Sequence, residues 1–215
     1  MIQFTDTSRL KRILCLGAHS DDVEIGCGGT ILRLIRENPG IEIRWVVFGG
    51  ADEKRRREAH ESAARYLEGV AKSQVKVFAF RDAFMGFDGV AVKESFEELK
   101  REFNPDLIFT HFRDDRHQDH RLLSDLAWNT WRDHTILEYE ILKYDGDLGR
   151  PNLYAPLPED ICRRKIELLM SGFPTQATRQ WFTEDTFWSL MRIRGVECNS
   201  ATKFAEAFYC RKIIL

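Results

Sequence analysis

The sequence predicts an α/β fold with a mostly parallel β-sheet, and three observations carry that prediction. Short apolar runs without strict alternation recur along the chain, as expected for strands that are covered on both faces. Charged segments with helical periodicity separate these runs, and such alternation is typical of parallel sheets joined by right-handed crossovers. Polar clusters directly follow two of the runs, at the sheet edge where α/β proteins bind their ligands.

The elements in the first half of the chain are defined by apolar runs and by their ends. The predicted strands cover residues 12–17, 41–48, 75–80 and 106–111. The predicted helices begin near Gly28 after the first strand, and cover residues 52–67 and 92–103 after the next two. Asn104-Pro105 closes the last of these helices, because proline cannot continue a helix and restrains the residue before it.

The second half of the chain has a less regular pattern. It predicts a helix at 122–131, strands at 137–144 and 152–157, a helix at 158–170, and either a helix end or a terminal strand at 204–215. No linker, repeat or shift in composition divides the chain, and 215 residues suffice for one sizeable core. We therefore expect a single domain over residues 1–215.

Composition narrows the class of partner and the compartment. The chain has 32 lysine and arginine residues against 34 acidic residues, so it lacks the positive field of a general nucleic-acid or membrane-surface binder. No apolar run approaches the length of a membrane span, and residues 1–6 lack the pattern of a signal peptide. The five scattered cysteines form no Cys-x-x-Cys pair. We expect a cytoplasmic protein with a small-molecule partner.

The first polar cluster places His19, Asp21 and Asp22 directly after the strand at 12–17. His19 and Asp22 are three residues apart, close enough in a turn to reach one ion, while Asp21 between them points elsewhere. Adjacent carboxylates raise one another's pKa unless a partner offsets their charge. A bound cation would provide that partner, so this corner predicts metal chemistry.

The second polar cluster follows the strand at 106–111, and its His117 and His120 repeat the three-residue spacing. Neighbouring strand ends can bring His19, Asp22 and one of these later histidines around a single ion. Three protein ligands with a place for water describe a hydrolytic zinc site, in which the pKa of the water falls to about 7.

The remaining polar residues of the two clusters then suit acid–base roles. Asp21 would take a proton as general base, and His117, if His120 is the ligand, would stabilise the oxyanion and protonate the leaving group. Asp119 would accept the N–H of a histidine and fix its tautomer.

The two clusters resemble the signatures of a known enzyme family. Residues 18–29 resemble the pattern Ala-His-Pro-Asp-Asp-x-Glu-x-x-x-Gly-Gly of the LmbE/PIG-L family of metal-dependent de-N-acetylases, and residues 117–121 resemble its His-Pro-Asp-His-Arg pattern. Ser20 and Gln118 replace prolines of these patterns at positions that hold no metal. Weaker similarities extend over most of the chain, at Arg57-Glu58, Ala63-Ala64, Leu67, Phe80-Arg81-Asp82, Lys165, Gln176 and residues 205–208.

The resemblance implies a Rossmann-like three-layer α/β domain that removes an acetyl group from an N-acetylated amino sugar or its conjugate. It implies zinc as the metal, with iron as the alternative. Related enzymes often form homo-oligomers, and the sequence leaves the oligomeric state of this chain open. It assigns roles residue by residue: His19, Asp22 and His120 as metal ligands, Asp21 as base, and His117 as the polarising or acid residue. Arg57 and Asp82 follow strands and are candidates for holding sugar hydroxyls or a conjugate's charge. A surface salt bridge and a turn cap are the alternatives for these two.

Other functions stay open on the sequence alone. Two histidines and a carboxylate also form the iron site of non-haem oxygenases, although those enzymes need neither Asp21 nor His117. Gly26-Cys27-Gly28-Gly29 near a helix start raises the alternative of a non-catalytic nucleotide-binding module, although its spacing is not Gly-x-Gly-x-x-Gly. A family member with a purely structural metal is the third alternative, and the presence of all five catalytic positions argues against it.

Overall fold

In the computed structural model, which describes residue 7 and residues 10–214, the strands form one seven-stranded sheet. The strands are β1 (Arg12–Gly17), β2 (Glu42–Val47), β3 (Lys72–Val77), β4 (Leu107–His111), β5 (Thr135–Tyr139), β6 (Leu153–Pro156) and β7 (Ala205–Cys210). The helices are α1 (Asp22–Glu37), α2 (Glu53–Tyr66), α3 (Gly89–Glu102), α4 (Gln118–Thr130), α5 (Glu159–Gly172) and α6 (Glu184–Glu197), with short 3-10 turns η2 (Met85–Asp88) and η3 (Pro174–Gln176). Residues 1–6, for which the sequence predicts no signal peptide, lie outside the described residues.

The order of the strands confirms the predicted α/β fold with a mostly parallel sheet. The order is β3-β2-β1-β4-β5-β7-β6, and the first five strands are parallel. Strand β7 runs antiparallel to both β5 and β6. After β1 the chain builds outward through β2 and β3, and then crosses back to β4 on the other side. The carboxyl ends of β1 and β4 therefore flank the switch point, which is where such sheets bind ligands.

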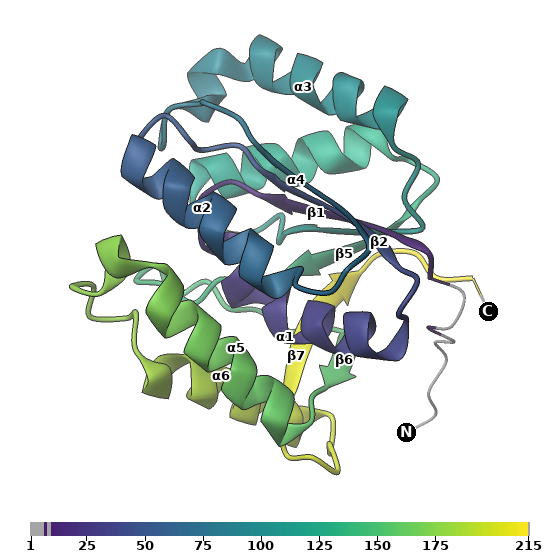
Figure 1. Cartoon of the computed structure of the whole chain (residues 1–215), viewed down its shortest axis with the longest axis vertical. Coiled ribbons are helices and arrows are strands. Elements are labelled where there is room, and N and C mark those ends of the chain that lie inside the picture. Colours follow the sequence, from purple (N-terminus) through teal and green to yellow (C-terminus); the bar gives the residue numbers. More distant parts are fainter. Residues whose placement is uncertain (1–6, 8–9, 215) are drawn as a thin grey trace.

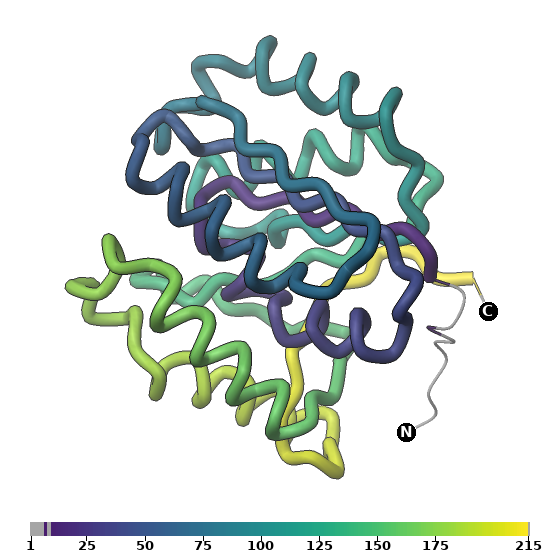
Figure 2. Tube along the Cα trace, viewed as in Figure 1, coloured from purple at the N-terminus to yellow at the C-terminus, as the bar shows by residue number. Residues whose placement is uncertain are grey.

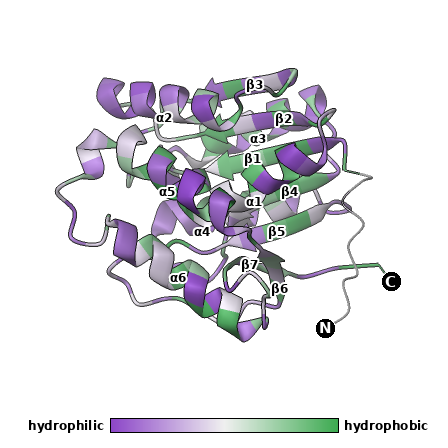
Figure 3. Cartoon of the chain, turned by 60° about the horizontal axis from the view of Figure 1, so that its bottom comes forward, coloured by the Kyte–Doolittle hydropathy of each residue, from purple (hydrophilic) through white to green (hydrophobic). Residues whose placement is uncertain are grey.

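Helices cover both faces of this sheet, which makes three layers (Figure 1). Side chains of β1 alternate between the two faces of the sheet. Ile13 and Cys15 pack with α1, α2 and α5 in one hydrophobic core, whereas Leu14 and Leu16 pack with α3 and α4 in the other. All four are fully buried, as the apolar run without alternation predicts. The trace in Figure 2 follows the chain through these layers, and Figure 3 shows apolar residues concentrated in β1, β4 and β5.

Helix α1 begins at Asp22, six positions before the start expected near Gly28. The acidic Asp22 and Glu24 lie in its first turn, where the helix dipole stabilises negative charge. Gly26 and Gly28 therefore lie inside the helix, against the aromatic rings of two tyrosines. A Cβ at Gly26 would lie 2.1 Å from the ring of Tyr139, and one at Gly28 would lie 2.8 Å from that of Tyr66. The glycines, which look like a turn in sequence, allow close packing of the helix.

The second half of the chain contains the largest departures from the predicted elements. Helix α6 was not predicted, because its buried side is small and includes Arg194 and Gly195 beside Phe187 and Met191. Of the two alternatives predicted for residues 204–215, the structure has the strand, β7. Strand β5 ends at Tyr139, five residues before the predicted end. Among the described residues, no helix has both the length and the apolar character to cross a membrane.

Candidate metal and active site

His19, Asp22 and His120 meet at the switch point between β1 and β4. Nδ1 of His19 lies 3.1 Å from Nε2 of His120 and 3.3 Å from Oδ2 of Asp22. Oδ1 of Asp22 lies 3.5 Å from Nε2 of His120. All three side chains are buried. The two corners that are about a hundred residues apart in sequence therefore form one cluster of donor atoms.

Local backbone bonds explain why the first corner takes this shape. Asp22 accepts a hydrogen bond of 2.6 Å from the backbone N–H of His19, which closes the turn between β1 and α1. The N–H of Ala18 donates to Nε2 of His111 at 2.9 Å, and so ties the end of β1 to the end of β4. His111 is fully buried and hydrogen-bonded, and its ring stacks on that of His120 with centroids 3.9 Å apart.

Asp115 orients His120, a role that the sequence alone does not assign. Its Oδ2 lies 2.9 Å from Nδ1 of His120, and its Oδ1 accepts the N–H of His117 at 2.8 Å. Lys143 lies 2.9 Å from the same carboxylate and balances its charge. Burial and the nearby His111 lower the pKa of His120 to about 4, so the ring is neutral and Nε2 offers a lone pair. The signal in the sequence was an Asp two residues before His117.

His19 lies among carboxylates. Its Nε2 is 2.7 Å from Asp82 and 3.3 Å from Asp119. Burial lowers the pKa of His19, but Asp22, Asp119 and Asp82 together raise it well above its usual value. Oδ1 of Asp119 is buried and has no hydrogen-bond partner among the described residues, while its Oδ2 accepts the N–H of Ala83 at 2.7 Å. This negative charge attracts a cation to the cluster.

Asp21 points away from its neighbour Asp22 and pairs with an arginine of α2. Its Oδ1 lies 2.9 Å from a guanidinium nitrogen of Arg55. Burial raises the pKa of Asp21 above its usual value, even though Arg55 opposes that shift. The structure does not bring Arg57 to the cluster: its side chain is 68% exposed and lies 3.9 Å from Glu61. Arg55, two residues earlier in α2, is the arginine that contacts Asp21.

His117 lies at the start of α4 and faces the cluster. Its Nδ1 accepts the N–H of Asp119 at 3.3 Å, so in the neutral ring the proton is on Nε2. Its ring centroid is 4.7 Å from that of His19 and 4.7 Å from that of His120. Burial and then His19 lower the pKa of His117. Gln118 donates to the carbonyl of Ala83 at 3.1 Å, and thereby joins α4 to the loop that carries Asp82.

The donor set fits a divalent metal. Three overlapping groups of donors, with all donor atoms within 4.8 Å, are found among the described residues: His19–His117–His120, His19–Asp82–His117–Asp119 and Asp22–His111–His120. Imidazole nitrogens with a carboxylate oxygen are typical ligands of zinc and of non-haem iron. The unpartnered oxygen of Asp119 and the surplus of buried carboxylates favour a cation here.

The glycine-rich part of α1 carries no phosphate site. Glu206 of β7 accepts the N–H groups of Gly29 at 2.9 Å and Thr30 at 2.6 Å. An internal carboxylate therefore occupies the donors that a bound phosphate would need, and both lie inside the helix. This finding removes the structural basis for the nucleotide-binding alternative.

The fold and the site together define a Rossmann-like α/β protein with two histidines and a carboxylate gathered at its switch point. The chain belongs to the GlcNAc-PI de-N-acetylase (PIG-L) family, whose sequence model matches residues 14–131. That range contains both polar corners and ends one residue after α4.

Individual proteins are similar to this chain in sequence or in fold. The uncharacterized deacetylase YaiS of Escherichia coli K12 is 29% identical over 123 residues, which are 54% of this chain and 65% of YaiS, less than two thirds of that relative. N,N'-diacetylchitobiose deacetylase from Pyrococcus horikoshii has the same fold, with a TM-score of 0.71 and 24% identity over 94% of this chain and 84% of that enzyme. So does GalB of Pseudomonas putida, a 4-carboxy-2-hydroxymuconate hydratase, with a TM-score of 0.71 and 16% identity over 96% of this chain and 98% of GalB.

Proposed function

We propose that this protein is a zinc-dependent N-deacetylase that removes the acetyl group from an N-acetylated amino sugar or its conjugate. One observation carries the proposal: donor atoms of His19, Asp22 and His120 lie 3.1 to 3.5 Å apart, with Asp21 and His117 beside them. A buried metal site with an adjacent base and an adjacent N–H donor contains the groups that amide hydrolysis needs.

His19, Asp22 and His120 would hold the metal. When bound, it lowers the pKa of a coordinated water to about 7 and supplies positive charge beside the acetamide carbonyl. Asp115 supports this arrangement because its hydrogen bond fixes the proton of His120 on Nδ1 and leaves Nε2 free.

Asp21 would act as the general base. Its carboxylate takes a proton from the water as the water oxygen bonds to the carbonyl carbon. The raised pKa of Asp21 makes it a stronger base than an exposed aspartate, and the contact with Arg55 favours its ionised form and orients its side chain.

His117 would act on the other side of the carbonyl. With Nδ1 accepting the N–H of Asp119, its Nε2–H is free to donate to the developing oxyanion. As the C–N bond breaks, the amine nitrogen receives the Nε2 proton of His117, and the proton that Asp21 took from the water returns to His117, so that acetate and the free amine are released. Asp119 supports both histidines, since its carboxylate borders His19 and its backbone N–H donates to Nδ1 of His117.

Substrate contacts are proposed for Asp82 and for an arginine of α2. Asp82 is within 2.7 Å of His19 and its side chain is 64% exposed, so it can accept a sugar hydroxyl at the mouth of the site. Arg55 is better placed than Arg57 for the arginine role, because it contacts Asp21. We further propose a cytoplasmic enzyme, which agrees with its five free cysteines.

The decisive experiment measures acetate. Protein of known metal content is incubated with N-acetylglucosamine, N,N'-diacetylchitobiose and UDP-N-acetylglucosamine, and acetate and free amine are quantified. Release of both in equal amounts, abolished by His120→Ala, supports the deacetylase. Because the related hydratase GalB shares the fold, water addition without acetate release, or oxygen uptake with an oxidisable cosubstrate, would overturn the proposal.

A further inference from the structure

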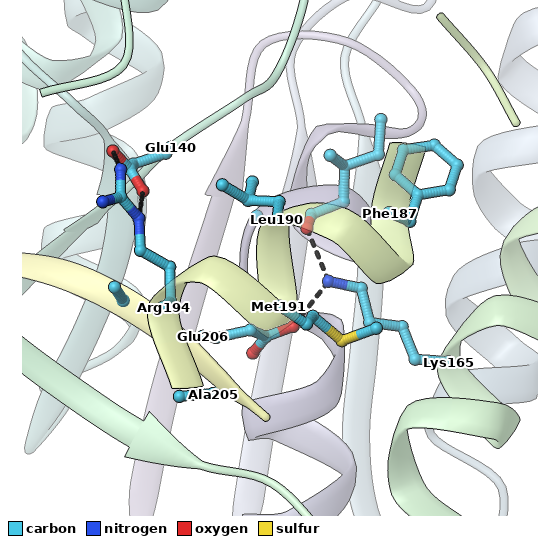
Figure 4. Close-up of a pocket in the computed structure, with 11 residues that line it drawn as sticks. Glu140, Lys165, Phe187, Leu190, Met191, Arg194, Ala205 and Glu206 are labelled. Atoms are coloured by element: carbon cyan, nitrogen blue, oxygen red, sulfur yellow. Dashed lines mark hydrogen bonds and ion pairs between the residues drawn. The ribbon is translucent and has the colours of Figure 1, made fainter. Parts of the chain in front are cut away.

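A buried ion pair, Lys165 with Glu206, contacts the backbone of α1 behind the metal ligands. Nζ of Lys165 lies 2.6 Å from Oε1 of Glu206 and donates to the carbonyl of Ile25 at 2.6 Å. Figure 4 shows the ammonium group of Lys165 beside the carboxylate of Glu206. Both side chains are buried, and both come from elements outside residues 14–131, namely α5 and β7. The pair fastens α1 to the second half of the chain.

The pair engages the hydrogen-bond ladder of α1 itself. In a helix, the N–H of Gly29 pairs with the carbonyl of Ile25, four residues earlier. Here Lys165 contacts that carbonyl while Glu206 accepts that N–H, together with the N–H of Thr30. Opposite charges therefore hold both partners of one helical bond. A side chain at Gly29 would be 3.0 Å from the carboxylate, so the helix backbone must be bare for Glu206 to reach it.

Ile25 transmits this contact to the first turn. Its carbonyl is held by Lys165, and its own N–H donates to the carbonyl of Asp21 at 3.0 Å. A single residue thus separates the buried ammonium from the backbone of the proposed base. On a neighbouring side, Tyr139 lies against Gly26 and donates to the carbonyl of Leu16 at the end of β1.

We infer that Lys165 and Glu206 are positioning residues, which set the first turn of α1 and thereby place Asp21 and Asp22 against His19 and His120. The inference rests on the proposed function for the roles of Asp21 and Asp22. The pair acts through the helix backbone, because its bonds to α1 go to the backbone of Ile25, Gly29 and Thr30.

The chain offers a matched control, because a second buried ion pair borders the same small cavity of about 20 Å³. Arg194 of α6 makes bonds of 2.9 and 2.7 Å to Glu140, and both side chains are as buried as those of the first pair. Figure 4 shows the two pairs on either side of α6. Arg194 bonds with Glu140, Glu197 and the carbonyl of Gly149, none of which belongs to α1.

The experiment compares the double variants Lys165→Met/Glu206→Gln and Arg194→Met/Glu140→Gln. Each removes both charges, so neither leaves an unpaired charge buried. For each we measure the melting temperature, zinc affinity by chelator competition, kcat and KM for the best substrate, and amide hydrogen exchange over residues 20–27. We expect the first variant to lose about 10- to 100-fold in zinc affinity and kcat, with KM nearly unchanged and faster exchange at Ile25. The control should lose melting temperature alone.

If the two variants lose equal melting temperature and also equal zinc affinity and kcat, the role of the first pair is merely structural and the inference is wrong. Wild-type zinc affinity, kcat and hydrogen exchange in the first variant would overturn it as well. If that variant does not fold, Lys165→Gln/Glu206→Gln replaces it, because it also removes both charges and keeps polar groups for the backbone of α1, and the same pattern is expected. If wild-type protein binds no zinc and releases no acetate, the proposed function fails. Hydrogen exchange at Ile25 still decides the positioning role, because it needs neither metal nor substrate.

Discussion

Oδ2 of Asp115 lies 2.9 Å from Nδ1 of His120, whose Nε2 faces Asp22 and His19. Asp115 therefore decides which nitrogen of His120 carries the proton. Its other bond to the donor cluster, among the described residues, is to the backbone N–H of His117. A ligand histidine usually has such an acceptor behind it, because the acceptor fixes both the tautomer and the plane of the ring.

The first prediction concerns this acceptor. Asp115→Asn keeps the shape of the side chain but removes the charge that holds the Nδ1 proton. We expect zinc affinity to fall about 10- to 100-fold, as measured by competition with a chromogenic chelator. Asp114→Asn changes the same charge on an exposed neighbour and should leave the affinity unchanged. Equal affinities in the two variants would remove Asp115 from the site.

The second prediction separates the base from the metal ligands. Asp21→Asn removes the proton acceptor without altering His19, Asp22 or His120. General-base catalysis contributes about 10²- to 10⁴-fold, so kcat should fall by that factor while zinc content stays at the wild-type value. Metal analysis of the purified variant checks the second part. A variant that retains its turnover would show that another group takes the proton.

The third prediction decides between two arginines of α2. Arg55 contacts Asp21, whereas Arg57 is largely exposed. Arg55→Ala should lower kcat/KM by about 10- to 100-fold, because it leaves a buried carboxylate without its partner. Arg57→Ala should change it by less than about twofold, as for an exposed ion pair. The opposite ranking would restore the assignment made from the sequence.

The residues that can bind a metal or transfer a proton could be predicted from the sequence, but most of the residues that hold them in position could not. His19, Asp22 and one of the two later histidines could be predicted to meet because parallel strands end at one edge, and that argument needs only the strands. The choice of His120 over His117 came from the family resemblance. Asp115, Arg55 and Lys143 could not be assigned, since their contacts depend on how α2 and the loop after β5 pack. Glu206 shows the same limit, because a strand near the end of the chain supplies an acceptor for a helix near its start.

The errors in secondary structure have a related cause. The glycines of α1 look like a turn unless Tyr66 and Tyr139 are known to lie against them. Helix α6 buries an arginine, which local pattern cannot distinguish from an exposed one. In both places tertiary contacts override the local preference.

The fourth prediction concerns metal and stability. A ligand that binds only the folded state stabilises it by mass action, by about 2.7 kcal/mol at a hundred times its Kd. Zinc added to chelator-stripped protein should therefore raise the melting temperature in a concentration-dependent manner. His120→Ala should abolish this rise, while His134→Ala, at a position outside the cluster, should preserve it. An unchanged melting curve for the wild-type protein would exclude a tight zinc site.

The fifth prediction tests why glycine is needed inside α1. Gly26→Ala places a methyl group 2.1 Å from the ring of Tyr139, which is fully buried and held by its bond of 2.7 Å to the carbonyl of Leu16. The ring cannot move without breaking that bond, so overpacking should cost about 1–3 kcal/mol in the free energy of unfolding. Gly40→Ala meets no atom within 4 Å and should change it by less than about 0.5 kcal/mol. Urea denaturation of the two variants measures both values. Because Gly26 lies next to Ile25, Gly26→Ala should also reduce zinc affinity. A variant that is destabilised but binds zinc as tightly as the wild type would show that the first turn of α1 keeps its place when the rest of the helix shifts.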